Sequence, residues 1–365
     1  MSGNPESPND GPPIAPARPI GWGMIGCGDV TEIKSAPAFN RIPGSRLVAV
    51  MSRTAARVQD YAARHAVPRW YADAGELLRD PGVNAVYIAT PPSSHADYTC
   101  LAAAAGKPVY VEKPMAHTVA DCRRMIAACT AHGVPLFVAY YRRCQARFLK
   151  VKELLDAGAI GEVRLVRIAL WMPPRPEDRR RDDLPWRVRP EIAGGGYFHD
   201  MAAHQLDLLD FWFGPLRNAT GWAGNQAGWY PADDLVTARF DLENGAVGHG
   251  SWCFTTDATA QLDRTEILGR RGMIRFACFE PTPVEWHTSA GVESFDLIPP
   301  QPVAQPLIER VVATLQGRGT CPSTGETALR TSEVMEAICR RSAATIQSNH
   351  ETHEVHERRS EEPVG

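Results

Sequence analysis

Short apolar runs alternate with amphipathic stretches from Ile20 to about residue 140 of the chain. The runs at 20–25, 47–51, 83–88, 108–111 and 136–139 predict strands, and the stretches at about 29–40, 54–65, 73–79, 95–105 and 118–131 predict helices. Strands that alternate with helices form parallel sheets joined by right-handed crossovers. The first half is therefore predicted to be an α/β domain with a doubly wound parallel sheet.

After about Tyr141 the pattern changes. It predicts a helix at about 144–157, a strand at 162–172, a loop rich in Pro and Arg, and a helix at about 197–213. The stretch 216–298 holds several strand candidates with turn signals at 243–245 and 269–272, and helices are expected at about 303–316 and 325–347. Consecutive strands joined by short turns predict an α+β domain with a mostly antiparallel sheet.

A chain of 365 residues is long for one hydrophobic core, which favours two domains. We expect a flexible Pro-rich tail at 1–19, the first domain at 20–142, the second at 143–348 and a charged tail at 349–365.

Charge and cysteine content narrow the class of protein. A net charge of -3 offers no basic surface for nucleic acid, and no apolar run approaches the length of a membrane span. Residues 1–19 lack the apolar core of a secretory signal. The nine cysteines are scattered without metal-binding spacing. We therefore expect reduced thiols, no metal and a cytoplasmic location.

The first strand leads into a glycine turn, Gly26-Cys27-Gly28-Asp29-Val30-Thr31, which opens the first helix. The first glycine permits a tight turn, and the second lets the backbone approach a pyrophosphate at the helix N-terminus. Thr31 stands where the fingerprint has a third glycine. The turn predicts a dinucleotide site that includes Gly26, Gly28, Asp29 and Val30; the alternative is a structural turn without a ligand.

The end of the second strand bears on the choice between NAD and NADP. NAD-binding domains usually place Asp or Glu there for the ribose 2′-hydroxyl, whereas this chain has Ser52 and Arg53. Both side chains can bond a 2′-phosphate, Arg through its planar fork. We predict NADP as the preferred cofactor, with NAD as the alternative if Arg53 is merely an exposed residue at a helix start.

Chemically active side chains follow the strand at 108–111 and begin the helix at 197–213. Lys113 lies directly beyond its strand, where ligands bind in open α/β sheets, and a cis bond at Pro114 would aim it into a cleft. Asp200 and His204 are four apart, so they share one helix face after the glycine run at 194–196. The alternatives are a surface lysine and a histidine satisfied in the core.

The chain resembles the Gfo/Idh/MocA oxidoreductase family over roughly residues 20–345, and four segments that follow one another in the chain carry the resemblance. They are the turn at 26–30, Thr90-Pro91-Pro92-Ser93-Ser94-His95, Glu112-Lys113-Pro114, and the stretch from Gly194 through Asp200 to His204. The resemblance implies a Rossmann domain and an open-faced second domain whose sheet often mediates oligomerisation, here a homodimer or homotetramer. It also implies NAD(P)-dependent redox on sugars, inositols, anhydro-sugars or dihydrodiols.

The resemblance further implies roles for individual residues. Lys113 would be the acid/base, and Asp200 and His204 would orient the substrate and assist proton transfer. Glu112 with the loop of Thr90, Pro91 and His95 would line the nicotinamide ribose. A cationic nicotinamide beside Lys113 would favour its neutral, base form.

The loop at 171–189 interleaves opposite charges, a pattern typical of a solvated loop. Its position between the first strand of the second domain and the helix at 197–213 makes it a candidate for a lid over the cleft or for a subunit contact. Trp186 and Arg187 are our candidates for contact with a sugar-like polyol, by stacking on its ring and bonding its oxygens. Tyr141 and Arg142 end the last strand of the first domain and are further candidates, although they can equally pack at the domain junction.

Two other functions remain open. One is a glycosidase that holds NAD tightly for transient oxidation and elimination, and the other is a non-catalytic regulator that binds a cofactor. Ser52 and Arg53 argue weakly against the first, and the set of Lys113, Asp200 and His204 argues against the second because a regulator needs no acid/base group.

Overall fold

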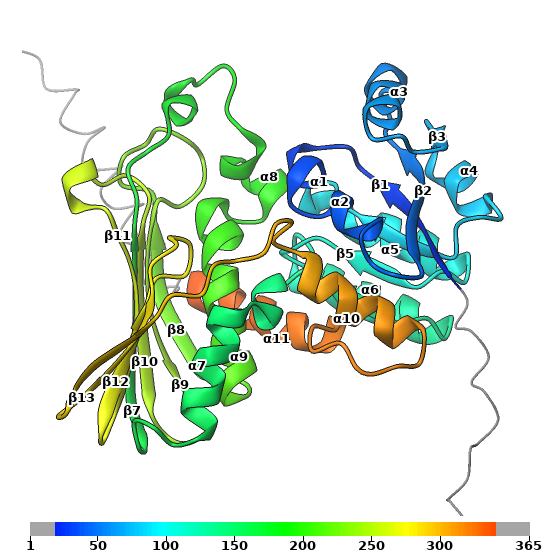
Figure 1. Cartoon of the computed structure of the whole chain (residues 1–365). Helices are drawn as coiled ribbons and strands as arrows, with labels where there is room; N and C mark the ends of the chain where they lie inside the picture. The colour runs from blue at the N-terminus through cyan, green and yellow to red at the C-terminus, as the bar shows by residue number, and fades with distance from the viewer. Residues whose placement is uncertain (1–18, 341–365) are drawn as a thin grey trace, which may run out of the picture.

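A computed structural model describes residues 19–340 of the protein. The chain forms two sheets that stand side by side, a parallel sheet A from the first half and a larger sheet B from the second (Figure 1). The predicted helix at 325–347 is described as far as Cys339. The predicted tails at 1–19 and 349–365 lie, but for residue 19, outside the described residues.

Sheet A has the strand order β3-β2-β1-β4-β5-β6, and every pairing in it is parallel. Its strands are β1 (Ile20–Ile25), β2 (Ser45–Met51), β3 (Arg69–Tyr71), β4 (Ala85–Ile88), β5 (Val109–Val111) and β6 (Leu136–Val138). The order reverses between β1 and β4, and ligands of such sheets bind at that reversal. The predicted doubly wound sheet is confirmed.

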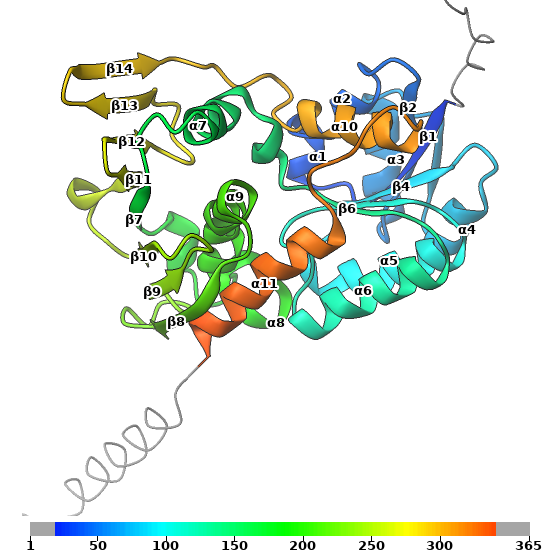
Figure 2. The same cartoon turned by 90° about the horizontal axis from the view of Figure 1, so that it is seen from below.

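Helices cover both faces of sheet A (Figure 2). The first half contains α1 (Asp29–Ile33), α2 (Ala36–Phe39), α3 (Ala55–Arg64), α4 (Ala74–Arg79), η1 (Pro92–Ser94), α5 (His95–Ala104), α6 (Val119–Ala131) and η2 (Tyr141–Cys144). Along β1, Trp22 and Met24 pack with α2 and α3, whereas Ile25 packs with α4. Strand residues alternate between the faces, so one strand supplies both cores.

Two details of the first half differ from the prediction. The helix expected at 29–40 is broken into α1 and α2, because Pro37 in the first turn of α2 has no N–H with which to continue a helix from α1. Strand β3 was not predicted. It is an edge strand of three residues whose side chains are mostly exposed, so it lacks an apolar signature.

Sheet B has the order β14-β13-β12-β11-β7-β10-β9-β8. Its strands are β7 (Val163–Trp171), β8 (Arg217–Gly224), β9 (Leu235–Asp241), β10 (Val247–Cys253), β11 (Leu262–Gly269), β12 (Gly272–Phe276), β13 (Val284–Thr288) and β14 (Gly291–Phe295). Only the central β7–β10 pair is parallel among its named strands. The predicted mostly antiparallel sheet is confirmed.

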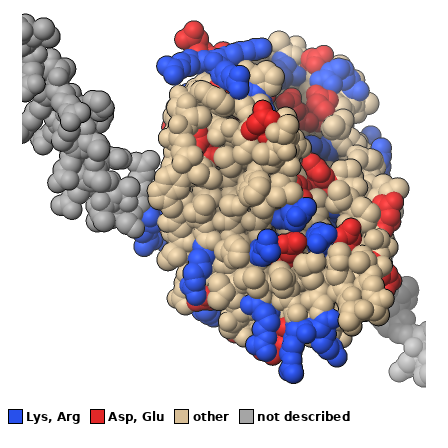
Figure 3. Space-filling view, turned by 90° about the vertical axis from the view of Figure 1, so that its left-hand side faces the viewer, with Lys and Arg blue, Asp and Glu red and all other residues tan. Residues whose placement is uncertain are grey.

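One face of sheet B is covered by helices α7 (Ala146–Asp156), α9 (Ala203–Phe213) and α11 (Gly325–Cys339) (Figures 1 and 2). Trp252 of β10 is fully buried on that face and donates to Gln205 of α9. The opposite face is uncovered, and on it charged side chains gather within a mostly uncharged surface (Figure 3). Arg167, Glu266, Arg275 and Glu285 form a charged row across neighbouring strands, joined by ion pairs of 3.4 to 3.5 Å.

The segment between β7 and α9 is built from short helices rather than being a continuous loop. These are η3 (Pro176–Arg179), η4 (Trp186–Val188) and α8 (Pro190–Ala193), followed by a π-helical turn η5 (Phe198–Ala202) that runs into α9. The predicted helix at 197–213 is therefore π-helical at its start. Such turns are frequent at functional sites because they aim side chains out of the regular α-helical register.

Helix α10 (Gln305–Leu315) returns to the first half of the chain, beside α2 and η2 (Figure 2). Its buried face, which includes Leu307 and Val311, packs in the core of Trp22 and Phe39. The sequence placed this helix in the second domain because the helix follows that domain's strands along the chain. None of the described helices is both long and apolar enough to cross a membrane.

Candidate active site

The glycine turn after β1 has the geometry that a dinucleotide site requires. Gly26 has φ +104, and a Cβ there would lie 2.7 Å from the Ala89 carbonyl oxygen, so only glycine fits. A Cβ on Gly28 would meet nothing within 4 Å, which leaves open space beside the turn. Thr31 is buried and donates to the Gly28 carbonyl at 2.7 Å, so its hydroxyl closes the turn where a third glycine would otherwise allow close packing.

Ser52 and Arg53 follow β2 at the same edge of sheet A. The Ser52 hydroxyl accepts from the backbone N–H of Thr54 at 3.4 Å, and Arg53 is exposed. Neither side chain is buried in the fold, so both are accessible to a ligand at the carboxyl end of β2.

His95 ties the loop after β4 to the segment after β5. It is fully buried, its Nε2 lies 2.7 Å from the Thr90 carbonyl oxygen, and its Nδ1 lies 3.2 Å from those of Pro114 and Met115. The bond between Lys113 and Pro114 is cis. Since both ring nitrogens face carbonyl groups, His95 fixes the two loops relative to each other.

Glu112 is also buried. The Tyr87 hydroxyl donates to its Oε1 at 2.6 Å, and the Lys113 backbone N–H lies 3.3 Å from its Oε2. Burial raises the pKa of the Glu112 carboxyl, against the opposing effects of the Tyr87 hydrogen bond and the nearby Lys113 charge. Glu112 therefore helps to hold the strand end from which Lys113 projects.

Lys113 and Asp200 are 87 positions apart in sequence and in contact in space. The Lys113 ammonium donates to the Asp200 carboxylate and, at 2.9 Å, to its backbone carbonyl, while the Arg187 Nε lies 3.4 Å from the other carboxylate oxygen. Burial raises the pKa of Asp200, but Lys113, Arg187 and Arg175 outweigh it and hold that pKa at about 2. Asp200 is thus an anion held among cations.

His204 lies one turn beyond Asp200 and is 4% exposed. Its ring meets the edges or faces of Tyr140, Tyr141 and Phe279 at centroid distances of 5.3 to 6.0 Å. Burial, and then the nearby Arg142, Lys113 and Lys34 charges, lower its pKa well below the ordinary histidine value. The imidazole is therefore neutral, and its Nδ1 is buried with no partner among the described residues.

Tyr141 and Arg142 lie at this junction between the sheets. The Arg142 guanidinium is buried between the Tyr141 and Phe279 rings, 5.0 and 4.6 Å from their centroids, and donates to the Tyr141 hydroxyl at 2.9 Å. Its Nε donates to the Cys278 carbonyl at 3.2 Å. Both predicted substrate contacts therefore lie beside His204, with part of Arg142 used in joining the two halves.

A buried ion cluster fixes the helix that carries the site. Arg143, next along the chain, donates to Asp207 at 2.7 and 2.8 Å and to Asp210 at 2.9 Å, and Arg330 from α11 donates to Asp210 at 2.7 Å. The side chains of Arg143, Asp207 and Asp210 are 1 to 3% exposed. The cluster fixes α9 relative to the end of sheet A, and so sets the distance from Lys113 to Asp200 and His204.

Sequence reasoning missed two residues of this cleft. Arg175 acts electrostatically on Asp200, and its guanidinium lies 4.8 Å from the centroid of the Tyr197 ring. Asp178 is fully buried, where it accepts from the Tyr197 hydroxyl at 2.7 Å and from the Arg175 backbone N–H at 2.9 Å. The loop holds five other arginines between 171 and 189, and only the fold distinguishes Arg175 from them.

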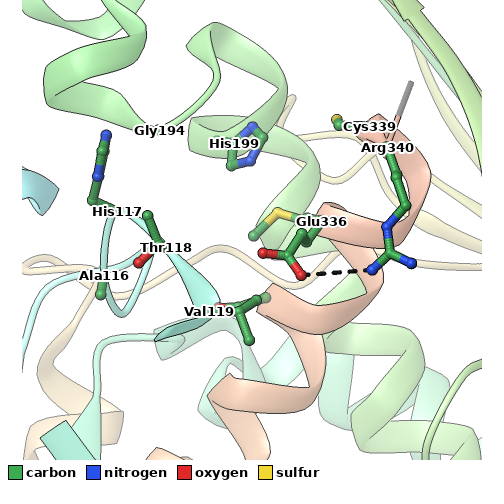
Figure 4. Close-up of a pocket in the computed structure, with 11 residues that line it drawn as sticks. Ala116, His117, Thr118, Val119, Gly194, His199, Glu336, Cys339 and Arg340 are labelled. Atoms are coloured by element: carbon green, nitrogen blue, oxygen red, sulfur yellow. Dashed lines mark ion pairs between the residues drawn. The ribbon is translucent and has the colours of Figure 1, made fainter. Parts of the chain in front are cut away.

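A separate pocket of about 290 Å³ lies behind the segment after Pro114, against the end of α11 (Figure 4). His117, His199, Glu336 and Arg340 are among its lining side chains, and Lys113, Asp200 and His204 are not. Within residues 19–340, no three His, Cys, Asp or Glu side chains are placed to hold a metal ion.

Two family models match the chain. Residues 20–140 match a model described as an oxidoreductase family with an NAD-binding Rossmann fold, and residues 148–275 match the GFO/IDH/MocA C-terminal domain. Together the matches include the turn after β1, the segment of Lys113, and Asp200 with His204.

Individual relatives agree with the family models. Oxidoreductase P35 of Formosa agariphila is 38% identical, with 88% of this chain and 98% of that protein covered. The 1,5-anhydro-D-fructose reductase of Ensifer adhaerens is 28% identical, with 84% and 91% covered. Among solved structures, the WlbA dehydrogenase of Bordetella pertussis in complex with NADH and UDP-GlcNAcA superposes with a TM-score of 0.77 at 26% identity, with 89% and 96% covered.

Proposed function

The chain belongs to the Gfo/Idh/MocA family of oxidoreductases, and from that premise we propose that it oxidises or reduces a small polyhydroxylated molecule. The substrate is a sugar, inositol, anhydro-sugar or dihydrodiol, and hydride passes between its hydroxyl or carbonyl carbon and a nicotinamide. The contact of Lys113 with Asp200 carries the proposal, because Lys113 follows β5 at the same edge of sheet A where the glycine turn follows β1. A relative that reduces an anhydro-sugar and a neighbour crystallised with NADH and a sugar nucleotide support it.

Lys113 is the proton donor in the direction of reduction. An ammonium group has three N–H donors, and Asp200 accepts two of them through its carboxylate and its backbone carbonyl. The third is free to donate to the oxygen of a substrate carbonyl. In oxidation the neutral amine takes the hydroxyl proton back, and Asp200 keeps the nitrogen in place in both directions.

His204 holds the same substrate oxygen. Because its imidazole is neutral, it can donate or accept a hydrogen bond without adding charge. Its position against Tyr140 and Tyr141 restricts the orientation of the ring. His204 and Lys113 together would fix the reacting carbon, and such placement is a main contribution of proteins of this kind to rate.

The residues present fit a dinucleotide. Gly26 and Gly28 make a tight turn whose backbone a pyrophosphate can approach closely, and the space beside Gly28 is open. The bound nicotinamide supplies the hydride acceptor or donor. Arg53 and Ser52 at the end of β2 would bind a 2′-phosphate, so we propose NADP as the preferred cofactor. Fluorescence titration with NADPH and NADH tests this, and tighter binding of NADH would contradict it.

We also propose that the uncovered face of sheet B joins two copies of the chain in a homodimer or homotetramer. Trp222 and Val292 are 43% and 58% exposed, and the charged row alternates in sign. A second copy related by a two-fold axis could therefore set its cations against the anions of the first. Sedimentation velocity is the test, and a monomer at micromolar concentration would contradict it.

The variant Lys113→Met tests the central proposal. Wild-type protein is screened with sugars, inositols and dihydrodiols by nicotinamide absorbance, and the variant is then assayed with the substrate found. We expect turnover to fall by about 10²- to 10⁴-fold, the contribution of a positioned acid or base, with cofactor affinity unchanged.

Lys107→Met is the matched control, because the Lys107 ammonium only donates to the Val83 carbonyl at 2.6 Å. Retained turnover in Lys113→Met would remove Lys113 from its role. Substrate conversion without net change in nicotinamide absorbance would instead favour the glycosidase that works by transient oxidation.

A further inference from the structure

The cleft at Asp200 holds more positive than negative charge. Lys113, Arg187 and Arg175 all act on the Asp200 carboxylate, so three cations face one anion there. The other nearby carboxyl, Glu112, is buried against Tyr87. With the buried Asp178 carboxylate beside the Arg175 backbone counted as well, positive charge still exceeds negative charge in this partly buried cleft, and a negatively charged ligand offsets the excess.

Arg187 is positioned to receive such a ligand. Its guanidinium lies 4.5 Å from the centroid of the Trp186 ring, and its side chain is 32% exposed. Its Nε lies 3.4 Å from an Asp200 oxygen, a longer contact than the two that Lys113 makes. A guanidinium that stacks on an aromatic ring keeps its in-plane N–H groups available, and that fork matches the two oxygens of a carboxylate.

Arg175, twelve positions before Arg187 in the same segment, also lies against an aromatic ring. Its guanidinium lies near the Tyr197 ring, and no carboxylate of residues 19–340 lies within ion-pair distance of it. Its backbone is fixed by the fully buried Asp178, which also accepts from the Tyr197 hydroxyl. Within the described part of the chain, the Arg175 guanidinium therefore makes no ion pair of its own.

We infer that the substrate is an anionic polyol, whose carboxylate or phosphate is bound by Arg187 and Arg175 while a hydroxyl or carbonyl carbon faces Lys113. This inference rests on the proposed function and narrows its substrate class. Sugar acids and sugar phosphates share the required oxyanion. Trp186, beside Arg187, supplies an apolar face for the sugar ring that carries the oxyanion.

The test uses three sugars that differ only at C6: D-glucose, D-glucuronate and D-glucose 6-phosphate, with the galacto and manno series in parallel. Each is titrated by calorimetry into the protein saturated with its oxidised cofactor. We expect one class of anion to bind at least about tenfold tighter than the neutral sugar, because hydrogen bonds to charged groups are stronger than those between neutral groups. Added salt should weaken only the anion's binding.

The variant Arg187→Leu should abolish that preference and raise KM far more than it lowers kcat. Arg187→Lys, which keeps the charge and loses the fork, should be intermediate. Arg180→Leu is the matched control, because Arg180 is an exposed arginine of the same segment. Thermal unfolding of each variant separates loss of binding from loss of fold.

Each outcome bears on the inference. A preference for uronates or for sugar phosphates identifies which oxyanion Arg187 and Arg175 bind. Equal or tighter binding of neutral sugars, no binding of any sugar by cofactor-loaded protein, or an unchanged preference in Arg187→Leu would overturn it. Selective binding of an anion without any change in nicotinamide absorbance would leave the inference standing and contradict the proposed function.

Discussion

Arg143→Met removes the centre of the buried ion cluster beneath the active site. The arginine makes short hydrogen bonds to Asp207 and Asp210, and these side chains are 1% and 3% exposed. Asp210 keeps Arg330, at 2.7 Å, but no other cation is paired with Asp207 among the described residues. The substitution therefore leaves one carboxylate in the interior without a counter-charge.

Breaking a buried ion pair from one side costs about 3–5 kcal/mol, against a typical total stability of about 5–15 kcal/mol. Burial already raises the pKa of Asp207 to about 6, although Arg143 opposes that rise. Without Arg143 this pKa should rise further, so the folded state binds a proton that the unfolded state releases above about pH 4. The loss of stability is therefore greatest at neutral pH and shrinks as the pH falls towards 5.

Urea unfolding at pH 7.5 and pH 5 measures both effects, with an unchanged m-value as the sign that the folded state remains compact. Arg123→Met is the control, since Arg123 pairs with Glu333 at the surface with 61% and 42% exposure and should cost at most about 1 kcal/mol. Equal destabilisation of the two variants, or no dependence on pH, would refute the reasoning. Because the cluster fixes α9, turnover should fall as well.

Two further predictions concern the histidine of the separate pocket and the glycine turn. Burial lowers the pKa of His199 to about 4, so the protein should lose stability between about pH 6.5 and pH 4, where the unfolded chain takes up a proton that the folded chain does not. The variant His199→Gln should remove up to roughly 3 kcal/mol of that loss. Thermal unfolding of both proteins at pH 7.5 and pH 4.5 measures the difference. An unchanged slope would contradict this. Gly28→Ala should leave the melting temperature nearly unchanged, since a Cβ meets nothing within 4 Å, yet weaken cofactor binding by about tenfold or more in fluorescence titration. Unchanged cofactor affinity would mean that the pyrophosphate does not lie against this turn.

The sequence predicted the architecture well because the strands of sheet A are apolar on both sides and the turns of sheet B carry strong local signals. The prediction from sequence failed for segments whose local pattern does not indicate their position in the fold. β3 has mostly exposed side chains. Helix α10 belongs to a core whose other members lie mostly between Ile20 and Ala139, about 170 to 290 residues earlier in the chain. Periodicity reports the secondary structure of a segment and says nothing of which core that segment joins.

For the site, Lys113, Asp200 and His204 could be found because each follows a recognisable local signal, a strand end or a glycine run. The structure brings Lys113 to Asp200 and places His204 one turn away, while their chemical roles remain proposals. Arg175 and Asp178 could not be found. Their importance comes from contacts with Tyr197 across a segment of many similar charges, and composition does not distinguish those partners.

The return of α10 to the first sheet has a consequence for biosynthesis. Leu307, Ile308, Val311 and Val312 are fully buried in the core that Trp22 helps to form. While the ribosome is still making sheet B, the emerging N-terminal half lacks this cover and exposes apolar surface. The two halves must therefore complete folding together, late and through contacts of very long range, a route that is slow and prone to aggregation. A fragment cut at residue 142 would carry the glycine turn and yet be a poor substitute for the whole chain.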